Sequence, residues 1–179
     1  METYISILRG INVSGQKLIK MDALKKAYED LGFKNVHTYI QSGNVIFQTE
    51  EKELEQKISG QIQKQFGFEV PVIILTIDDL KQIIGNNPYK EDDTKDICYL
   101  YVTILSSGSV NPDTEPARLK QLPGEEFIVT ENAVYLYCPN GYGKTKLTNT
   151  FWESFLKVKA TTRNWKTTNE LLRIAESIK

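Results

Sequence analysis

The 179-residue sequence predicts an α+β protein made of two consecutive ferredoxin-like units, each a βαββαβ arrangement with an antiparallel sheet, and a C-terminal helix. Three observations support this fold class. Short runs rich in Ile and Val alternate with segments whose apolar residues recur at helical spacing. Several of these elements end at a glycine or at a cluster of turn-forming residues. The order of strands and helices then starts again after a charged stretch near residue 90.

The first half contains the elements of one complete unit. Leu24, Ala27 and Tyr28 share one face of a helix that Gly32 ends, and Gly43 permits the positive φ that a tight reversal between two strands needs. The expected strands are 4–8, 36–40, 44–48 and 70–75, and the expected helices are 20–31, 51–66 and 78–84.

The second half repeats this order. Leu147, Phe151 and Phe155 share one side of a helix, and Thr167 with Glu170 has the spacing of a capping box at the start of the terminal helix. The expected strands are 97–105, 127–130, 133–138 and 160–162, and the expected helices are 116–122, 144–157 and from 168 onward. The charged stretch before residue 97 marks the boundary. We therefore expect domains at 1–90, which includes the helix that trails the first unit, and at 91–179, which includes the C-terminal helix.

This topology places particular segments together. Right-handed crossovers make the first and third strands of each unit central, antiparallel neighbours. The end of the first strand and the start of the third then meet at one edge of the sheet. In the first unit that edge carries residues 9–12 and 41–44. Helices cover one face of each sheet, so the other face packs on the second unit, on another copy of the chain, or meets solvent.

The composition excludes several classes of function. The formal net charge of −1 gives no general attraction to nucleic acid or membranes. The chain has no apolar run of membrane-spanning length and does not start like a signal peptide, so we expect a cytoplasmic protein. Cys98 and Cys138 read as small buried hydrophobes in a reducing compartment, and with the lone His37 they form no plausible ligand set. We expect no metal and no cofactor.

Polar side chains gather where the first and third strands of the first unit would meet. We expect Arg9 to hold a phosphate or carboxylate, Asn12 and Asn44 to orient a ligand, and Ser42 to donate a hydrogen bond beside Gln41. The alternative is that the glycines of these stretches shape turns while the polar side chains cap backbone groups.

The basic C-terminal region offers two further candidate anion contacts. Residues 143–179 carry eight basic and three acidic side chains. Lys144 stands at an expected helix start, after a turn that contains glycines. The last residues of this turn resemble a P-loop, but Cys138 occupies the place of that motif's first glycine. Arg163 lies in a run of hydroxyl side chains. The alternatives are that this region pairs with the acidic residues 91–142 and that Arg163 sits in a simple connector.

Three separated motifs resemble those of a bacterial family, the domain of unknown function 1697. They are ILRGINV at 7–13, YIQSGNV at 39–45, and ATTRNW at 160–165 followed by Thr167. The resemblance runs from about Tyr4 to the end of the chain and implies two consecutive ferredoxin-like units. It implies no activity. Ser14 stands where family members usually have glycine, and Thr145 where they have serine, which weakens both a glycine requirement in the first loop and the P-loop likeness.

The expected function is binding of a small polar or anionic, phosphate-bearing ligand at the edge of the first sheet. The sequence shows no Ser/His/Asp group and no carboxylate pair at a catalytic spacing, so we assign no catalytic residue and do not expect an enzyme. Two alternatives stay open. One is a protein-interaction or homo-oligomerisation module, with a homodimer formed through open sheet faces. The other is a transferase that acts on a phosphorylated substrate.

Overall fold

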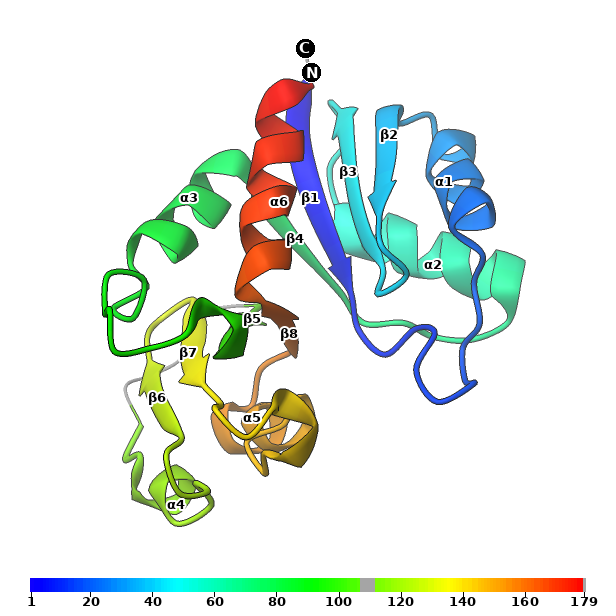
Figure 1. Ribbon diagram of the computed structural model, residues 1–179. Helices are drawn as coiled ribbons and strands as arrows, with labels where there is room; N and C mark the ends of the chain where they lie inside the picture. Colours follow the sequence, from blue (N-terminus) through cyan, green and yellow to red (C-terminus); the bar gives the residue numbers. More distant parts are fainter. Residues whose placement is uncertain (107–111, 179) are drawn as a thin grey trace. The chain divides into compact units, whose positions relative to one another are not determined.

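The computed structural model describes residues 1–106 and 112–178, and Figure 1 shows the path of the chain. The elements of the first half are β1 (Glu2–Leu8), α1 (Met21–Asp30), β2 (Lys34–Tyr39), β3 (Asn44–Thr49), α2 (Leu54–Phe66), β4 (Val72–Thr76) and α3 (Ile77–Gly85). The elements of the second half are β5 (Leu100–Leu105), α4 (Glu115–Arg118), β6 (Glu126–Val129), β7 (Ala133–Tyr137), α5 (Asn149–Leu156), β8 (Ala160–Asn164) and α6 (Trp165–Ser177). None of the helices in the described ranges is both long and apolar enough to cross a membrane.

Each half forms a four-stranded antiparallel sheet with the strand order of a ferredoxin-like unit. The first sheet has the order β2-β3-β1-β4 and the second has the order β6-β7-β5-β8. The first and third strands of each unit are therefore central neighbours, as the crossover rule predicts. The α+β class with two ferredoxin-like units and a C-terminal helix is confirmed. A further helix follows the last strand of each unit directly, α3 after β4 and α6 after β8.

The chain divides into two compact units. The first consists of Met1–Lys81 and the described residues from Glu170 onward, and the second consists of Gln82–Asn169. Both boundaries fall inside helices, since α3 contains the first and α6 the second. Within the first unit, Lys81 on α3 forms an ion pair with Glu176 on α6 at 2.9 Å. The first unit is thus completed by the C-terminal part of the chain.

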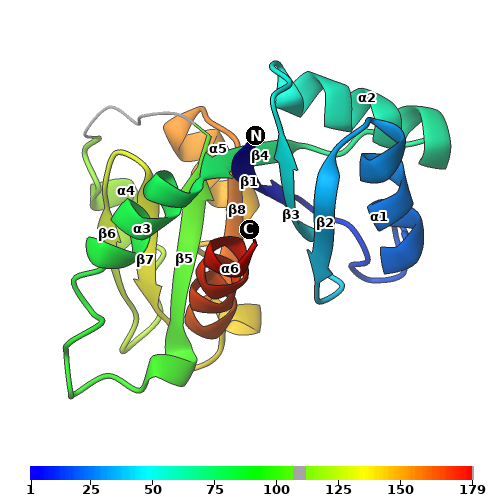
Figure 2. The same cartoon turned by 90° about the horizontal axis from the view of Figure 1, so that it is seen from above.

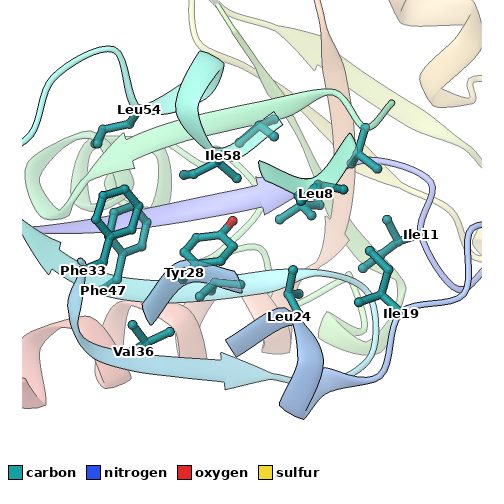
Figure 3. Packing of buried hydrophobic residues seen from close by; sticks show 14 residues of the cluster. Leu8, Ile11, Ile19, Leu24, Tyr28, Phe33, Val36, Phe47, Leu54 and Ile58 are labelled. Carbon is teal, nitrogen blue, oxygen red and sulfur yellow. The ribbon is translucent and has the colours of Figure 1, made fainter. Parts of the chain in front are cut away.

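The core of the first unit lies between its sheet and the helices α1 and α2, which share one face of the sheet (Figures 1 and 2). Phe33 stacks on Phe47 with ring centroids 4.6 Å apart, and Tyr28 meets Phe47 edge-on at 5.3 Å. Figure 3 shows this aromatic group, with Ile11 and Ile19 together near the end of β1. The core therefore continues to the edge at which the polar stretches lie.

The core of the second unit is built around α5, because α4 has only four residues. Trp152 on α5 is fully buried, and its ring meets Phe127 and Phe151 edge-on at 5.4 Å and 5.0 Å. The buried residues of this cluster are Leu105, Ala117, Phe127, Val134, Leu136, Cys138, Leu147, Trp152 and Ala160. In the second unit, aromatic packing thus comes from a helix. In the first unit it comes largely from the sheet and from the segment after α1.

Three element boundaries differ from the sequence prediction because side chains cap the backbone locally. α5 begins at Asn149 and not at 144, since Thr148 accepts from the N–H of Phe151 and Thr145 accepts from the N–H of Leu147. α6 begins at Trp165, so the predicted capping box is wrong, and Asn164 caps the helix by accepting from the N–H of Thr167 at 2.7 Å. β5 begins at Leu100, after a 3₁₀ turn that Asp96 caps.

Candidate functional site

The two polar stretches of the first unit lie side by side at one edge of its sheet. The N–H of Leu8 donates to the carbonyl of Gly43 at 2.8 Å, and Nδ2 of Asn12 donates to the carbonyl of Gln41 at 2.9 Å. Gly43 has a φ of 84°, and a Cβ there would approach Cβ of Leu8 to 2.8 Å. Close contact between the two stretches therefore requires glycine at this position.

Asn12 holds the loop between β1 and α1 in place. Its Nδ2 donates to the carbonyls of Ile19 at 3.0 Å and Gln41 at 2.9 Å, and its Oδ1 accepts from the N–H of Ile19 at 2.8 Å. Its φ of 55° is a left-handed conformation that asparagine tolerates better than most residues. Both amide hydrogens are used inside the protein, so Asn12 has no side-chain donor left for a ligand.

Asn44 and Ser42 close the hairpin between β2 and β3. The fully buried Asn44 donates through Nδ2 to the carbonyl of Tyr39 at 3.0 Å and to Oγ of Ser42 at 2.9 Å. Arg9 is half-buried, and its backbone N–H donates to the carbonyl of Pro71 at 3.0 Å. These contacts connect the sheet edge to itself, which agrees with the alternative prediction that the polar side chains shape turns and cap backbone groups.

A groove of about 500 Å³ opens beside this edge, at the start of α1. Its lining residues are Asn12, Leu18, Ile19, Lys20, Met21, Asp22 and Gln41. The sequence predicted Asn12 and Gln41 as site residues, and the structure places both on the groove. It does not place Arg9, Ser42 or Asn44 there. The sequence reasoning missed Lys20 and Asp22, although both flank the start of the helix that follows the predicted loop.

Three polar side chains of the groove are available to a ligand. Lys20, Asp22 and Gln41 are exposed, and their side chains make no hydrogen bond or ion pair within residues 1–106 and 112–178. No side chain caps the start of α1, so backbone N–H groups of its first turn stay open to water or a ligand. The groove thus combines a cation, a carboxylate, a primary amide and helix N–H donors.

The two anion contacts predicted in the second unit have different environments. Lys144 is exposed and ends a 3₁₀ turn at Tyr142–Lys144, five residues before α5 starts at Asn149. Arg163 lies in β8 and is 9% exposed, and its Nη1 donates to Oγ1 of Thr161 at 3.0 Å and to the carbonyl of Thr162 at 2.9 Å. Burial lowers the pKa of Arg163 to about 10, which leaves it charged at neutral pH.

The two cysteines differ in exposure. Cys138 is fully buried, and burial first, with the charge of Glu125 second, raises its pKa to about 12. Cys98 is exposed, so the prediction that both cysteines are buried is wrong for this residue. A hydrogen bond from its thiol to the carboxylate of Asp96 is the largest cause of its raised pKa. A raised pKa disfavours the thiolate, so neither cysteine has the character of an activated nucleophile.

A second cavity in the first unit, of about 440 Å³, lies at the start of α2. Its lining residues are Tyr4, Glu51, Lys52, Glu53, Leu54, Glu55, Gln56 and Ile74. Carboxylates near a helix start stabilise the helix through its dipole, which accounts for the three glutamates. In the described part of the chain, no group of three His, Cys, Asp or Glu residues is arranged to hold a metal ion.

Comparisons with known proteins agree with the fold. No curated protein sequence matches the chain significantly. The conserved bacterial protein SP0830 from Streptococcus pneumoniae has a similar structure, with a TM-score of 0.67 and 22% sequence identity, over 97% of this chain and 98% of that one. At this identity the likeness shows the fold alone. The profile of the family described as Protein of unknown function (DUF1697) matches residues 1–135.

Proposed function

Because the chain belongs to the DUF1697 family, whose description assigns no activity, we propose a function from the geometry of this protein: it binds a small polar or anionic ligand in the groove at the edge of the first sheet. The observation that carries the proposal is the gathering of Lys20, Asp22 and Gln41, three side chains without partners in the described chain, around one groove.

The size and the frame of the groove support the proposal. A volume of about 500 Å³ is in the range of small-molecule sites. Asn12 closes the loop on itself through two hydrogen bonds with Ile19 and joins it to the β2–β3 turn through one with Gln41, so the groove is largely formed before a ligand enters. A preformed site loses less conformational freedom on binding than one that must be ordered.

The lining offers groups suited to binding. It contains no serine, cysteine or histidine, and the side chains of Lys20 and Asp22 are exposed, with no neighbouring base or burial to activate them as nucleophiles. A transferase acting on a phosphorylated substrate finds no support in these residues. The proposal differs from the sequence-based hypothesis in its contacts, because Lys20 and not Arg9 is the cation of the groove.

The test is a thermal-shift screen of the purified chain against nucleotides, phosphorylated metabolites and amino acids. We expect at least one compound to raise the melting temperature, because a ligand of the native state stabilises it by mass action. The shift should disappear in Gln41→Ala and in Lys20→Met and persist in Lys144→Met, which removes an exposed lysine of the second unit. A shift that only Lys144→Met abolishes, or the absence of any shift, contradicts the proposal.

A further inference from the structure

Two opposite charges line the groove without neutralising each other. Lys20 immediately precedes α1 and Asp22 is its second residue. Neither side chain has an ion-pair partner in the described chain. Side chains two positions apart along a helix do not face each other, so a direct pair between them is disfavoured. The groove therefore offers a separate site for a negative group and for a positive group.

The rest of the lining is mostly aliphatic. Leu18 is 66% exposed, and Met21 is half-buried. Ile19 also lines the groove and is 4% exposed, since it belongs to the core beside Ile11 (Figure 3). A ligand that covers Leu18 and Met21 would remove apolar surface from water next to an existing core.

Two more exposed aliphatic side chains flank the polar residues of the groove. Val13 follows Asn12 and is 58% exposed, and Ile40 precedes Gln41 and is 47% exposed. The hydrogen bond between Asn12 and Gln41 keeps both at the same edge of the sheet. Ile40 has a φ of 48°, which β-branched residues rarely adopt, so the turn imposes this conformation against local preference. Val13 and Ile40 thus add exposed aliphatic surface beside the groove, and apolar surface rimmed by polar residues is typical of binding sites.

We propose that the ligand of this groove is a zwitterion with an aliphatic side group, the chemistry of a free aliphatic amino acid. This inference rests on the proposed function and narrows its ligand class. The carboxylate of the ligand binds Lys20 and the open N–H groups at the start of α1, where negative groups are favoured. The ammonium binds Asp22, the Gln41 amide hydrogen-bonds the polar end, and the side group lies on Leu18 and Met21.

The test is calorimetric titration of the whole chain with L-leucine, N-acetyl-L-leucine, L-leucinamide, glycine and inorganic phosphate. We expect L-leucine to bind most tightly. N-acetyl-L-leucine lacks the ammonium, L-leucinamide lacks the carboxylate, and glycine lacks the side group. Each should bind roughly tenfold more weakly or worse, because each loses one set of contacts.

Paired variants assign each charge to its residue. Lys20→Met should weaken binding of L-leucine and leave L-leucinamide unchanged, while Asp22→Asn should weaken L-leucine and leave N-acetyl-L-leucine unchanged. Lys25→Met, on the same helix and 3.9 Å from Glu29, is the matched control and should have no effect. All three positions are exposed, so the variants should fold normally.

The outcomes separate this inference from the proposed function. If phosphate or N-acetyl-L-leucine binds as tightly as L-leucine and Lys20→Met abolishes that binding, the zwitterion inference fails and the groove remains a site for anions. If none of the five compounds binds, the zwitterion inference fails and the proposed function rests on the wider thermal-shift screen. Binding of L-leucine that survives both charge variants also overturns the inference.

Discussion

The two units of the chain share one frame and fill it with different side chains. Ser6 on β1 and Thr103 on β5 occupy the same place, since each pairs with a valine of its unit's third strand and with a residue of its fourth. Ser6 shares a buried hydrogen bond with the hydroxyl of Tyr28 at 2.7 Å. Oγ1 of Thr103 instead lies 2.7 Å from Oγ1 of Thr162, which also accepts from the hydroxyl of Tyr142 and donates to Oδ1 of Asn149. The strand register thus sets the place of a polar core residue and leaves its partner free to vary.

The corresponding edges of the two sheets differ in the same way. The N–H of Leu8 donates to the carbonyl of Gly43 at 2.8 Å, and the N–H of Leu105 donates to the carbonyl of Asn132 at 3.0 Å. The backbone contact is therefore common to both units. Only the first unit needs glycine at this position. The loop that follows β1 folds back over the turn between β2 and β3, and it brings a side-chain atom of Ile11 within 2.8 Å of the point that a Cβ on Gly43 would occupy. The groove therefore depends on the loop after β1 and not on the strand arrangement that the two units share.

Each hairpin is also closed by its own device. In the first unit the Asn44 side chain donates to the carbonyl of Tyr39. In the second unit Ala133 occupies the equivalent position, and the hydroxyl of Thr130 accepts from the N–H of Ala133 at 3.2 Å. Asn44 therefore does a structural task that the second unit assigns to a threonine. The comparison separates the residues that shape the edge of the first sheet from those that line its groove.

The largest expected effect is from Gly43→Ala. The added Cβ meets Leu8 and Ile11 and the residue keeps a positive φ, so we expect a loss of about 3 kcal/mol in the free energy of unfolding. Asn132→Ala is the matched change at the exposed equivalent position and should alter stability by about 0.5 kcal/mol or less. Urea denaturation of both variants measures this difference, and equal losses would refute the close approach that forms the groove.

The next effect concerns the two buried hydroxyl arrangements. Ser6→Ala leaves the fully buried hydroxyl of Tyr28 without its partner and should cost about 2 kcal/mol. Thr162→Val should cost a similar amount, about 2 kcal/mol, because it leaves the fully buried hydroxyl of Thr103 without this partner, while Tyr142 and Asn149 are half-exposed and regain water.

The double variant Ser6→Ala with Tyr28→Phe is the internal control. It removes both partners and should be less destabilised than Ser6→Ala alone. A Thr162→Val variant that loses clearly less stability than Ser6→Ala would show that the buried Thr103 hydroxyl does not decide its cost.

Alkaline pH should destabilise the protein through buried acids that stay neutral in the folded state. The pKa of Cys138 rises from 9.0 to about 12 and that of Tyr135 from 10.0 to about 12, both mainly through burial. The unfolded thiol ionises first, so stability falls as the pH rises from about 9 towards 12. Near pH 10 the thiol accounts for a loss on the order of 1 kcal/mol.

The pH dependence has a matched control in the other cysteine. Cys138→Ala should flatten the first part of the alkaline decline, while Cys98→Ala should change it much less, because solvent screens the charge of Asp96 that raises the pKa of the exposed Cys98. Denaturation curves recorded at about pH 8, 9, 10 and 11 follow this decline. Both tryptophans, Trp152 and Trp165, belong to the second unit, so their fluorescence reports on that unit. An unchanged decline in Cys138→Ala would contradict the assignment.

The smallest effect is expected from Lys95→Met in the second unit. The Lys95 ammonium lies 2.9 Å from the carboxylate of Glu126 and 3.1 Å from that of Asp92. It also lies over the rings of Tyr89 and Tyr137. We expect a loss of about 1 kcal/mol or less, because both carboxylates reach solvent. Lys26→Met, which breaks an exposed pair with Asp30 in the first unit, should cause no measurable change in a urea titration. A loss for Lys95→Met as large as that for Gly43→Ala would contradict this ranking.

The sequence predicted the frame well and the local contacts poorly, for physical reasons. Strand and helix periodicity with the handedness of crossovers is enough to place residues 9–12 beside residues 41–44. It cannot reveal that the Asn12 amide is consumed by backbone groups of Ile19 and Gln41, because those bonds depend on the path of an irregular loop. The sequence did not indicate Lys20 as a site residue, because an exposed lysine before a helix is ordinarily solvated.

The starts of helices show the same limit. Thr148 and Asn164 cap α5 and α6, and the choice among neighbouring polar residues as caps depends on which backbone N–H group each can reach. Hydrophobic spacing fixes the face of a helix more firmly than its first residue.

The most direct test of the central claim, that the first unit's groove is a ligand site, is a nuclear magnetic resonance titration of the ¹⁵N-labelled chain with L-leucine. We predict shifts in the backbone signals of Leu18, Lys20 and Asp22 and in the side-chain amide signal of Gln41, which together line the groove. Signals of α5 and of the start of α2 should stay unchanged. No shift at saturating ligand would contradict the claimed ligand class, and shifts confined to the start of α2 or to the second unit would contradict the site.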